Sequence, residues 1–182
     1  FPGKEELLTA LVHQVSVLPS HSLARLSENI ELRSEERLRG ALQIMLHHVL
    51  EHPLRFRAID REEASLPTDI MGRHDKAKRE VMDIFSKIVE DGVVSGEFMP
   101  VDPRVAALSL IGMCTWTAWW YNPSGKINLD SVVTIVSELG VNAVMRREPA
   151  DKSDSTIEAM LRDIRLNLDH LERIVSLKDD SR

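Results

Sequence analysis

Two neighbouring stretches of the chain are too apolar to form ordinary surface helices. Residues Val105 to Tyr121 contain no charged side chain, and residues Leu129 to Met145 leave little polar face. A helix that is apolar on every side has to be buried on every side. We expect one side of each to pack on the chain's own core and the other to be covered by a second copy of the chain. The pattern predicts an all-α protein that dimerises through a four-helix interface.

A membrane span is the alternative explanation for such a run. Spans need about 20 predominantly apolar residues. The first run carries the hydroxyl side chains of Ser109, Thr115 and Thr117 and ends at Asn122-Pro123. We therefore expect no contact with a membrane.

The first hundred residues show helical periodicity interrupted by proline and glycine. We expect a first helix that Pro19 kinks or ends, and a second helix from Ser34 that Pro53 ends, because a proline disfavours the helical conformation at the residue before it. A short helix over 54–64 and a long one over 68–91 should follow. Gly92 and Gly96 then predict a turn.

The end of the chain has a different pattern. Residues 147–155 are polar and read as a linker, and residues 156–178 read as an amphipathic helix with an apolar seam over 157–175. The seam fits a terminal helix packed on its own domain. It also fits a coiled coil with a partner subunit, and the sequence leaves both interpretations open.

Residues able to carry chemistry are sparse. His47, His48 and His52 form the densest histidine group, but no further ligand at a suitable spacing completes a metal site. Phosphate-binding glycine loops, zinc-protease histidine pairs and nucleophile elbows are absent from the sequence. We expect no metal, no cofactor and no enzymatic activity.

The order of three motifs resembles the TetR family of bacterial transcriptional regulators. The opening Phe1-Pro2-Gly3-Lys4-Glu5-Glu6-Leu7-Leu8 is similar to the end of that family's DNA-binding module. Residues 90–98 resemble its turn before the eighth helix, and Asp102-Pro103 continues the match. The resemblance covers residues 1–146. It implies a TetR-like C-terminal helical bundle in a cytoplasmic homodimer.

The resemblance also implies a domain plan and partners. Residues 1–18 would be the end of the DNA-binding headpiece and the connecting helix, and residues 19–146 the ligand-binding and dimerisation domain. The helix-turn-helix that binds operator DNA would precede Phe1, and Lys4 matches a position that often meets a DNA phosphate. The implied function is a repressor that a small molecule releases from its operator. A net charge of −6 does not contradict this, because the headpiece would supply most basic contacts.

The predicted ligand site is an apolar cavity between the helices from Leu38 to Trp120. Trp116, Trp120 and Tyr121 resemble a branch whose members often sense acyl-CoA thioesters, and Arg57 and Arg61 would then meet the phosphates of the ligand. The residues predicted to line the cavity are Met45, His48, Phe56, Met71, His74, Phe85, Met113, Trp116 and Trp120. The predicted dimer contacts are Val132, Val136, Leu139, Gly140 and Ala143.

Two rival functions remain at this point. A helical adaptor would bind another protein through the 157–175 seam, so that deleting the seam would abolish partner binding. A small-molecule enzyme would need an acid–base pair inside the cavity. The sequence identifies neither the effector nor the operator.

Overall fold

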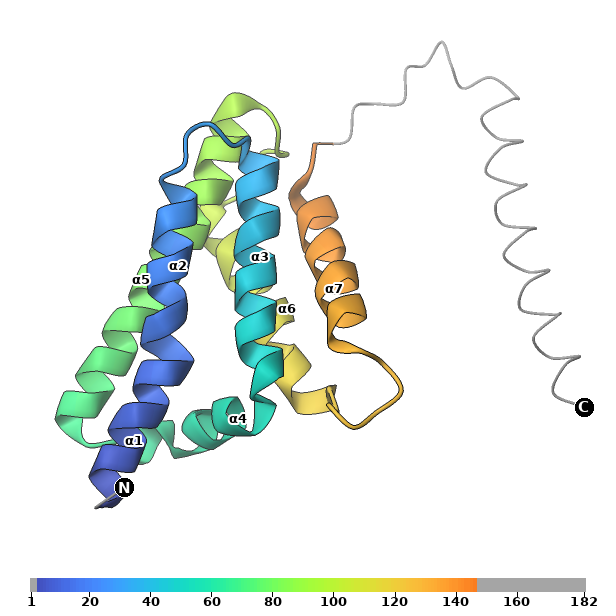
Figure 1. The fold of residues 1–182 in the computed structure, drawn as a ribbon. Helices are drawn as coiled ribbons and strands as arrows, with labels where there is room; N and C mark the ends of the chain where they lie inside the picture. Colours follow the sequence, from blue (N-terminus) through green and yellow to red (C-terminus); the bar gives the residue numbers. More distant parts are fainter. Residues whose placement is uncertain (1–2, 147–182) are drawn as a thin grey trace, which may run out of the picture. The chain divides into compact units, whose positions relative to one another are not determined.

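The computed structural model describes residues 3–146 as helices joined by short connections (Figure 1). In chain order the elements are α1 (Lys4–Val12), the π-helical turn η1 (His13–Val17), α2 (Leu18–Ser27), α3 (Ser34–Glu51), α4 (Pro53–Glu62), the 3-10 turn η2 (Glu63–Ser65), α5 (Thr68–Ser95), α6 (Pro103–Trp120) and α7 (Leu129–Val144). Within the described residues, extended pairing is limited to one bridge between Phe98 and Met145. The predicted all-α fold is confirmed. The predicted linker and C-terminal helix lie outside the described residues.

Several helix ends follow the signals in the sequence. Pro53 takes the first turn of α4, where its missing N–H is not needed. The carboxylate of Asp102 accepts a hydrogen bond from the backbone N–H of Val105 at 2.8 Å and caps α6. The side-chain oxygen of Asn128 accepts from the N–H of Ser131 at 2.7 Å and caps α7 in the same way. These caps fix where the two apolar helices begin.

The end of α5 differs from the prediction. Gly92 was expected to lie in a turn, but α5 continues to Ser95 and ends at Gly96, which has the left-handed φ of 81°. A Cβ atom on Gly92 would lie 2.2 Å from the ring of Phe98. Gly92 therefore serves packing, since its missing side chain lets the Phe98 ring lie against the helix.

The main core surrounds α3, which packs against α2, α5, α6 and α7 (Figure 1). Leu38, Leu42 and Leu46 lie on one face of α3 and are fully buried. Phe85 and Ile88 of α5 meet them in the same cluster and are also fully buried. This cluster joins the α2–α5 side of the molecule to α7.

A carboxylate from beyond α5 caps the start of α3. Glu97 accepts hydrogen bonds from the backbone N–H groups of Ser34 at 3.2 Å and Glu35 at 3.1 Å. Burial alone would raise the pKa of Glu97, but these backbone bonds lower it overall. The charged form is thus the one that the fold stabilises, as expected at a helix N-terminus.

The two apolar helices each have one buried and one exposed face. On α6, Leu110 and Cys114 are buried while Trp116 is 65% exposed. On α7, Val141 is buried while Leu139 is 57% exposed. Both helices therefore present large apolar side chains outside their own core. Among the described residues, we find no helix with the length and apolarity needed to cross a bilayer.

Candidate functional site

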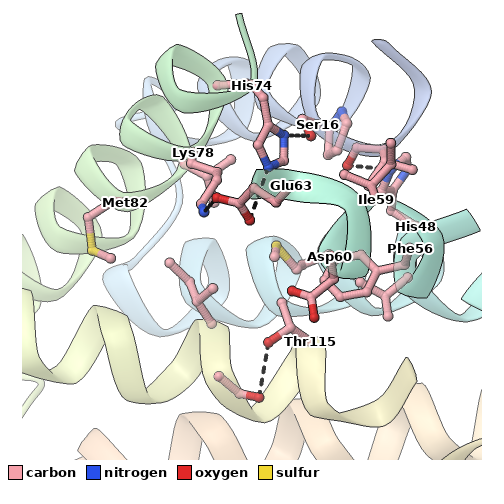
Figure 2. A pocket seen from close by; sticks show the side chains of 18 of the residues that line it. Ser16, His48, Phe56, Ile59, Asp60, Glu63, His74, Lys78, Met82 and Thr115 are labelled. Carbon is pink, nitrogen blue, oxygen red and sulfur yellow. Dashed lines mark hydrogen bonds and ion pairs between the residues drawn. The ribbon is translucent and has the colours of Figure 1, made fainter. Parts of the chain in front are cut away.

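Residues of η1, α2, α3, α4, η2, α5 and α6 line a cavity of about 510 Å³ (Figure 2). That size and a largely apolar wall are typical of small-molecule sites. The apolar side chains of the wall are Val15, Pro19, Met45, Val49, Phe56, Ile59, Ala77, Val81, Met82, Leu108, Ile111, Trp116 and Trp119. The polar side chains of the wall lie mainly on η1, α3, α4, η2 and α5.

Pro19, in the continuous helical segment formed by α1, η1 and α2, leaves one backbone carbonyl beside the cavity without its helical partner. Pro19 has no N–H, so it cannot make the helical hydrogen bond to the carbonyl of Val15. The sequence allowed Pro19 either to kink or to end the helix. In the structure the helix continues past Pro19 as α2, and the π-helical turn η1 comes directly before α2. The Nε2 atom of His48 on α3 bonds to the Val15 carbonyl at 3.0 Å. Because a carbonyl can only accept, Nε2 carries the hydrogen.

His48 is suited to hold this bond in its neutral form. Burial lowers the pKa of its imidazole, although the Val15 carbonyl and the nearby Glu51 act in the opposite direction. A neutral ring with its hydrogen on Nε2 satisfies the freed carbonyl without burying a charge. The interaction links α3 to the backbone of η1.

A second histidine links the same turn to α5. The Nδ1 atom of His74 lies 2.8 Å from the Ser16 hydroxyl, and His74 is only 5% exposed. Its Nε2 atom lies 3.6 Å from a carboxylate oxygen of Glu63 and has no hydrogen-bond partner among the described residues. Glu63 accepts a hydrogen bond from the Lys78 ammonium at 2.7 Å. Figure 2 shows these four side chains together at one end of the cavity.

The wall carries fixed charges of both signs. The hydrogen bond from Lys78 lowers the pKa of Glu63, against the opposing effect of burial, so Glu63 is ionised at neutral pH. Asp60 lies on the same wall, between Phe56 and Thr115 in Figure 2. Asp60 is exposed, and its carboxylate is in no ion pair with another described residue. The cavity thus combines a large apolar surface with two carboxylates and one ammonium group.

Part of the predicted ligand set lies on this wall. Met45, His48, Phe56, His74 and Trp116 all line the cavity. They come from α3, α4, α5 and α6, which are far apart in sequence. The structure therefore brings these five predicted residues to one site.

The other predicted ligand residues lie elsewhere. Met71 packs against a small separate cluster that contains Ile59 and Ile70. Phe85 is fully buried in the main core. Met113 is half-buried and Trp120 is 48% exposed on α6, and neither lines the cavity. Helical periodicity placed Phe85 on a buried face, but it cannot tell which level of a helix lies beside a cavity.

The two arginines predicted to meet ligand phosphates are engaged with α6. Arg57 donates hydrogen bonds to the carbonyls of Ala118 and Tyr121, at the C-terminal end of that helix. A cation is favourable there because of the helix dipole. The guanidinium of Arg61 lies 5.7 Å from the ring centroid of Trp119. Arg57 thus attaches α4 to α6, while Arg61 is exposed beside the wall.

The remaining predictions concern Lys4 and metal binding. α1 begins at Lys4, but the side chain of Lys4 is outside what the structure describes. His47 and His52 do not line the main cavity. Over the described residues, no group of three or more histidine, cysteine or acidic side chains is arranged to hold a metal ion.

Sequence reasoning missed several residues of the wall. Ser16, Glu63 and Lys78 were not predicted, and they form the polar end together with His74. Thr115 and Trp119 were missed on the apolar side. Pro19 inside a helical pattern was the available signal for the turn η1, because it marks a place where a backbone carbonyl needs a new partner.

The predicted dimer residues divide between two faces of α7. Val132 and Gly140 are buried in the subunit's own core, and a Cβ atom on Gly140 would lie 2.8 Å from Leu42. The close backbone approach at Gly140 is therefore to α3 of the same subunit. Val136 is half-buried, whereas Leu139 and Ala143 are exposed. Ile135 (58%), also on α7, and Leu108 (54%), on α6, are further exposed apolar side chains.

The chain resembles solved structures of transcriptional regulators. A TetR/AcrR family regulator from Thermobifida fusca is 26% identical, with a TM-score of 0.69 over 80% of this chain and 77% of that one. AibR in complex with isovaleryl coenzyme A and operator DNA is 24% identical, with a TM-score of 0.63 over 75% of this chain and 74% of that one. The ketosteroid regulator KstR2 of Mycobacterium tuberculosis is 15% identical, with a TM-score of 0.73 over 81% of this chain and 76% of that one. The last two show the fold alone.

A comparison with curated proteins found no match. A family model described as the tetracyclin repressor-like C-terminal domain matches residues 31–144. These residues run from just before α3 to the end of α7, and so include most of the cavity wall. The match spans more than half of the chain, which therefore belongs to the TetR family of regulators and carries that family's ligand-binding domain.

Proposed function

We propose that this chain is the effector-binding and dimerising part of a transcriptional repressor. A small molecule in the cavity would release the protein from operator DNA. The observation that carries this proposal is the pair of hydrogen bonds between cavity histidines and η1. One joins His48 to the Val15 carbonyl, and the other joins His74 and the Ser16 hydroxyl. The turn η1 continues α1, and the DNA-binding headpiece is proposed to precede α1. Occupancy of the cavity and the position of the headpiece would thus be linked.

The energetic basis is a population shift. A ligand changes the balance of two arrangements only if it binds them with different affinities. A ligand that displaces either histidine bond favours an arrangement in which η1 and α1 have moved. In a dimer, moving both headpieces changes their spacing, which has to match successive major grooves for DNA binding.

The proposed effector is an acyl-CoA. The wall is apolar enough for an acyl chain, and AibR, which shares this fold, was solved with isovaleryl coenzyme A and operator DNA. The phosphates would remain outside the cavity, near the exposed Arg61. Arg57 is less suited to this role than the sequence indicated, because its donors already hold the end of α6.

The test uses the protein with its upstream residues restored. Operator binding is measured by fluorescence anisotropy, with decanoyl-CoA and shorter acyl-CoAs as probes. We expect salt-dependent binding that the acyl-CoA weakens, together with a higher Tm of the ligand-bound protein. Absence of DNA affinity would contradict the repressor, and absence of any ligand effect across chain lengths would contradict the effector class.

A matched pair of glycine variants shows whether the cavity is responsible. Gly112 lines the cavity and Gly72 lies on the exposed side of α5, and a Cβ atom would meet nothing within 4 Å at either position. Gly112→Leu should fill part of the cavity and reduce the ligand-induced rise in Tm. Gly72→Leu should keep the wild-type response. Equal responses in both variants would place the ligand elsewhere.

The dimer is proposed to form through the exposed faces of α6 and α7. Replacing both Ile135 and Leu139 with glutamate puts four charges into the paired interface, and we expect monomers by light scattering. Val94 is the control, because it is 83% exposed near the end of α5, a helix that is not part of the proposed interface. Val94→Glu should leave the dimer mass unchanged. A dimer that survives the double substitution would rule out this interface.

A further inference from the structure

The charges on the cavity wall restrict the chemistry of the ligand's polar end. Glu63 and Lys78 form an ion pair at 2.7 Å, and Asp60 adds a carboxylate that is unpaired within the described residues. Asp60 and Lys78 are exposed at this end of a mainly apolar wall, so a ligand that covers them has to replace the water that they lose. The polar end of the ligand therefore has to suit this arrangement directly.

An anionic end fits poorly. A free carboxylate would lie close to Asp60 and Glu63, which have the same charge. The Lys78 ammonium has further donors, but its charge is already balanced by Glu63, so the three side chains together keep a net negative charge. Taking an anion out of water without a partner is strongly unfavourable.

A cationic end could pair with Asp60, but it would have to lose its water beside the Lys78 ammonium, which has the same charge. An uncharged group that both donates and accepts avoids repulsion from either sign. An amide does this: its N–H can be donated to a carboxylate of Glu63 or Asp60, and its carbonyl can accept from Lys78. Each charged side chain then gains a partner.

The position of Glu63 is fixed before any ligand arrives. Lys78 bonds one carboxylate oxygen, and the His74 ring, itself held by Ser16, faces the other at 3.6 Å. Ordering a flexible side chain during binding weakens affinity, and here that ordering has already taken place. The carboxylate of Glu63 is thus preorganised to bind a ligand group.

We propose that the cavity receives an uncharged, amide-bearing end of an apolar chain at Asp60, Glu63 and Lys78, and rejects the carboxylate of the same chain. The inference rests on the proposed function, in which this cavity binds the effector. An acyl-CoA satisfies it, because the pantetheine arm contains amides and the phosphates remain outside. The protein would then respond to the thioester and not to the free fatty acid.

The experiment compares two probes that differ in one group, decanamide and decanoate at neutral pH, by calorimetry on the dimeric protein. We expect decanamide to bind at least about tenfold more tightly. Glu63→Gln removes a repelling charge and frees Lys78, so decanoate should gain affinity and the preference should shrink or reverse. Glu62→Gln makes the same change in net charge one residue earlier, on an exposed side chain outside the wall, and should keep the wild-type preference.

The outcomes separate the inference from the proposed function. Decanoate binding as tightly as decanamide, or a preference that Glu63→Gln leaves unchanged, overturns the inference while the repressor proposal stands. Failure of decanamide to bind while decanoyl-CoA still raises the Tm also overturns the inference alone. Failure of all three probes overturns both the inference and the proposed effector class.

Discussion

The two halves of α5 lie in different surroundings although one apolar stripe runs along the helix. In its C-terminal half, Phe85 and Ile88 are fully buried in the main core. In its N-terminal half, His74 and Ala77 face the cavity. We call the packed core around Phe85 and Ile88 the solid region. The hollow region is the cavity beside His74 and Ala77, where hydrogen bonds join the helices.

We expect the packed region to determine stability and the cavity region to determine the response to an effector. Substitutions in the solid region should lower the free energy of unfolding strongly, because each buried side chain contacts many others. At the hollow region, the helices are joined by His48 to Val15 and by His74 to Ser16, and a ligand can exchange such bonds for its own. Substitutions should therefore affect folding in the solid region and effector response in the hollow one.

The largest expected contrast compares two phenylalanines. Phe85→Ala should lower the free energy of unfolding by about 3–5 kcal/mol, because it leaves a cavity in a packed core. Phe56 is half-buried on the cavity wall, so Phe56→Ala should reduce stability much less and weaken ligand binding more. Urea unfolding and calorimetry measure the two effects. Similar losses of stability would mean that the two regions do not differ as described.

Two glycines of α5, Gly92 and Gly72, give a smaller contrast, in which alanine lowers stability at one position and raises it at the other. Gly92→Ala should destabilise by about 1–3 kcal/mol, because the new methyl group would overlap the Phe98 ring, which lies 2.2 Å from the Cβ position. Gly72→Ala has nothing within 4 Å and should stabilise by about 0.5–1 kcal/mol. Both are measured as shifts in the urea midpoint. A stabilised Gly92→Ala protein would show that Phe98 can move away freely.

The sequence was sufficient to predict the helices because their signals are local. The capping side chains Asp102 and Asn128 and the proline Pro53 act within one turn of the helix ends that they define. The failure at Gly92 has a physical reason: a glycine that ends a helix and one that admits a neighbouring ring look alike in sequence. Only the position of Phe98 separates them.

The site was harder to predict because its parts are not local. Met45 and Phe56 were expected on the wall from residue type and face, and they lie there. Glu63 and Lys78 are brought together by the turn between α4 and α5, and a single sequence gives no signal for that pairing. Pro19 indicated a disturbed helix, but the sequence did not indicate that His48 would bind the Val15 carbonyl that Pro19 leaves free.

Two glutamates with lowered pKa values give the smallest contrast. Glu97 accepts from two backbone N–H groups of α3 at the solid end, so Glu97→Ala should reduce stability at neutral pH by about 1 kcal/mol, as for other helix caps. Glu63 is paired with the half-exposed Lys78, and Glu63→Ala should change stability by less than about 1 kcal/mol.

The pH dependence of the Glu97 effect follows from the sign of its shift. The pKa of Glu97 is lower in the folded state than in the unfolded state, so its contribution is complete above the unfolded pKa. The contribution disappears as the pH falls through the lower, folded value. Urea titrations of wild type and Glu97→Ala should therefore converge in acid and separate towards neutral pH. A difference in unfolding free energy that widens in acid would mean that the protonated side chain is the better cap. The charge of Glu97 would then not be what stabilises the start of α3.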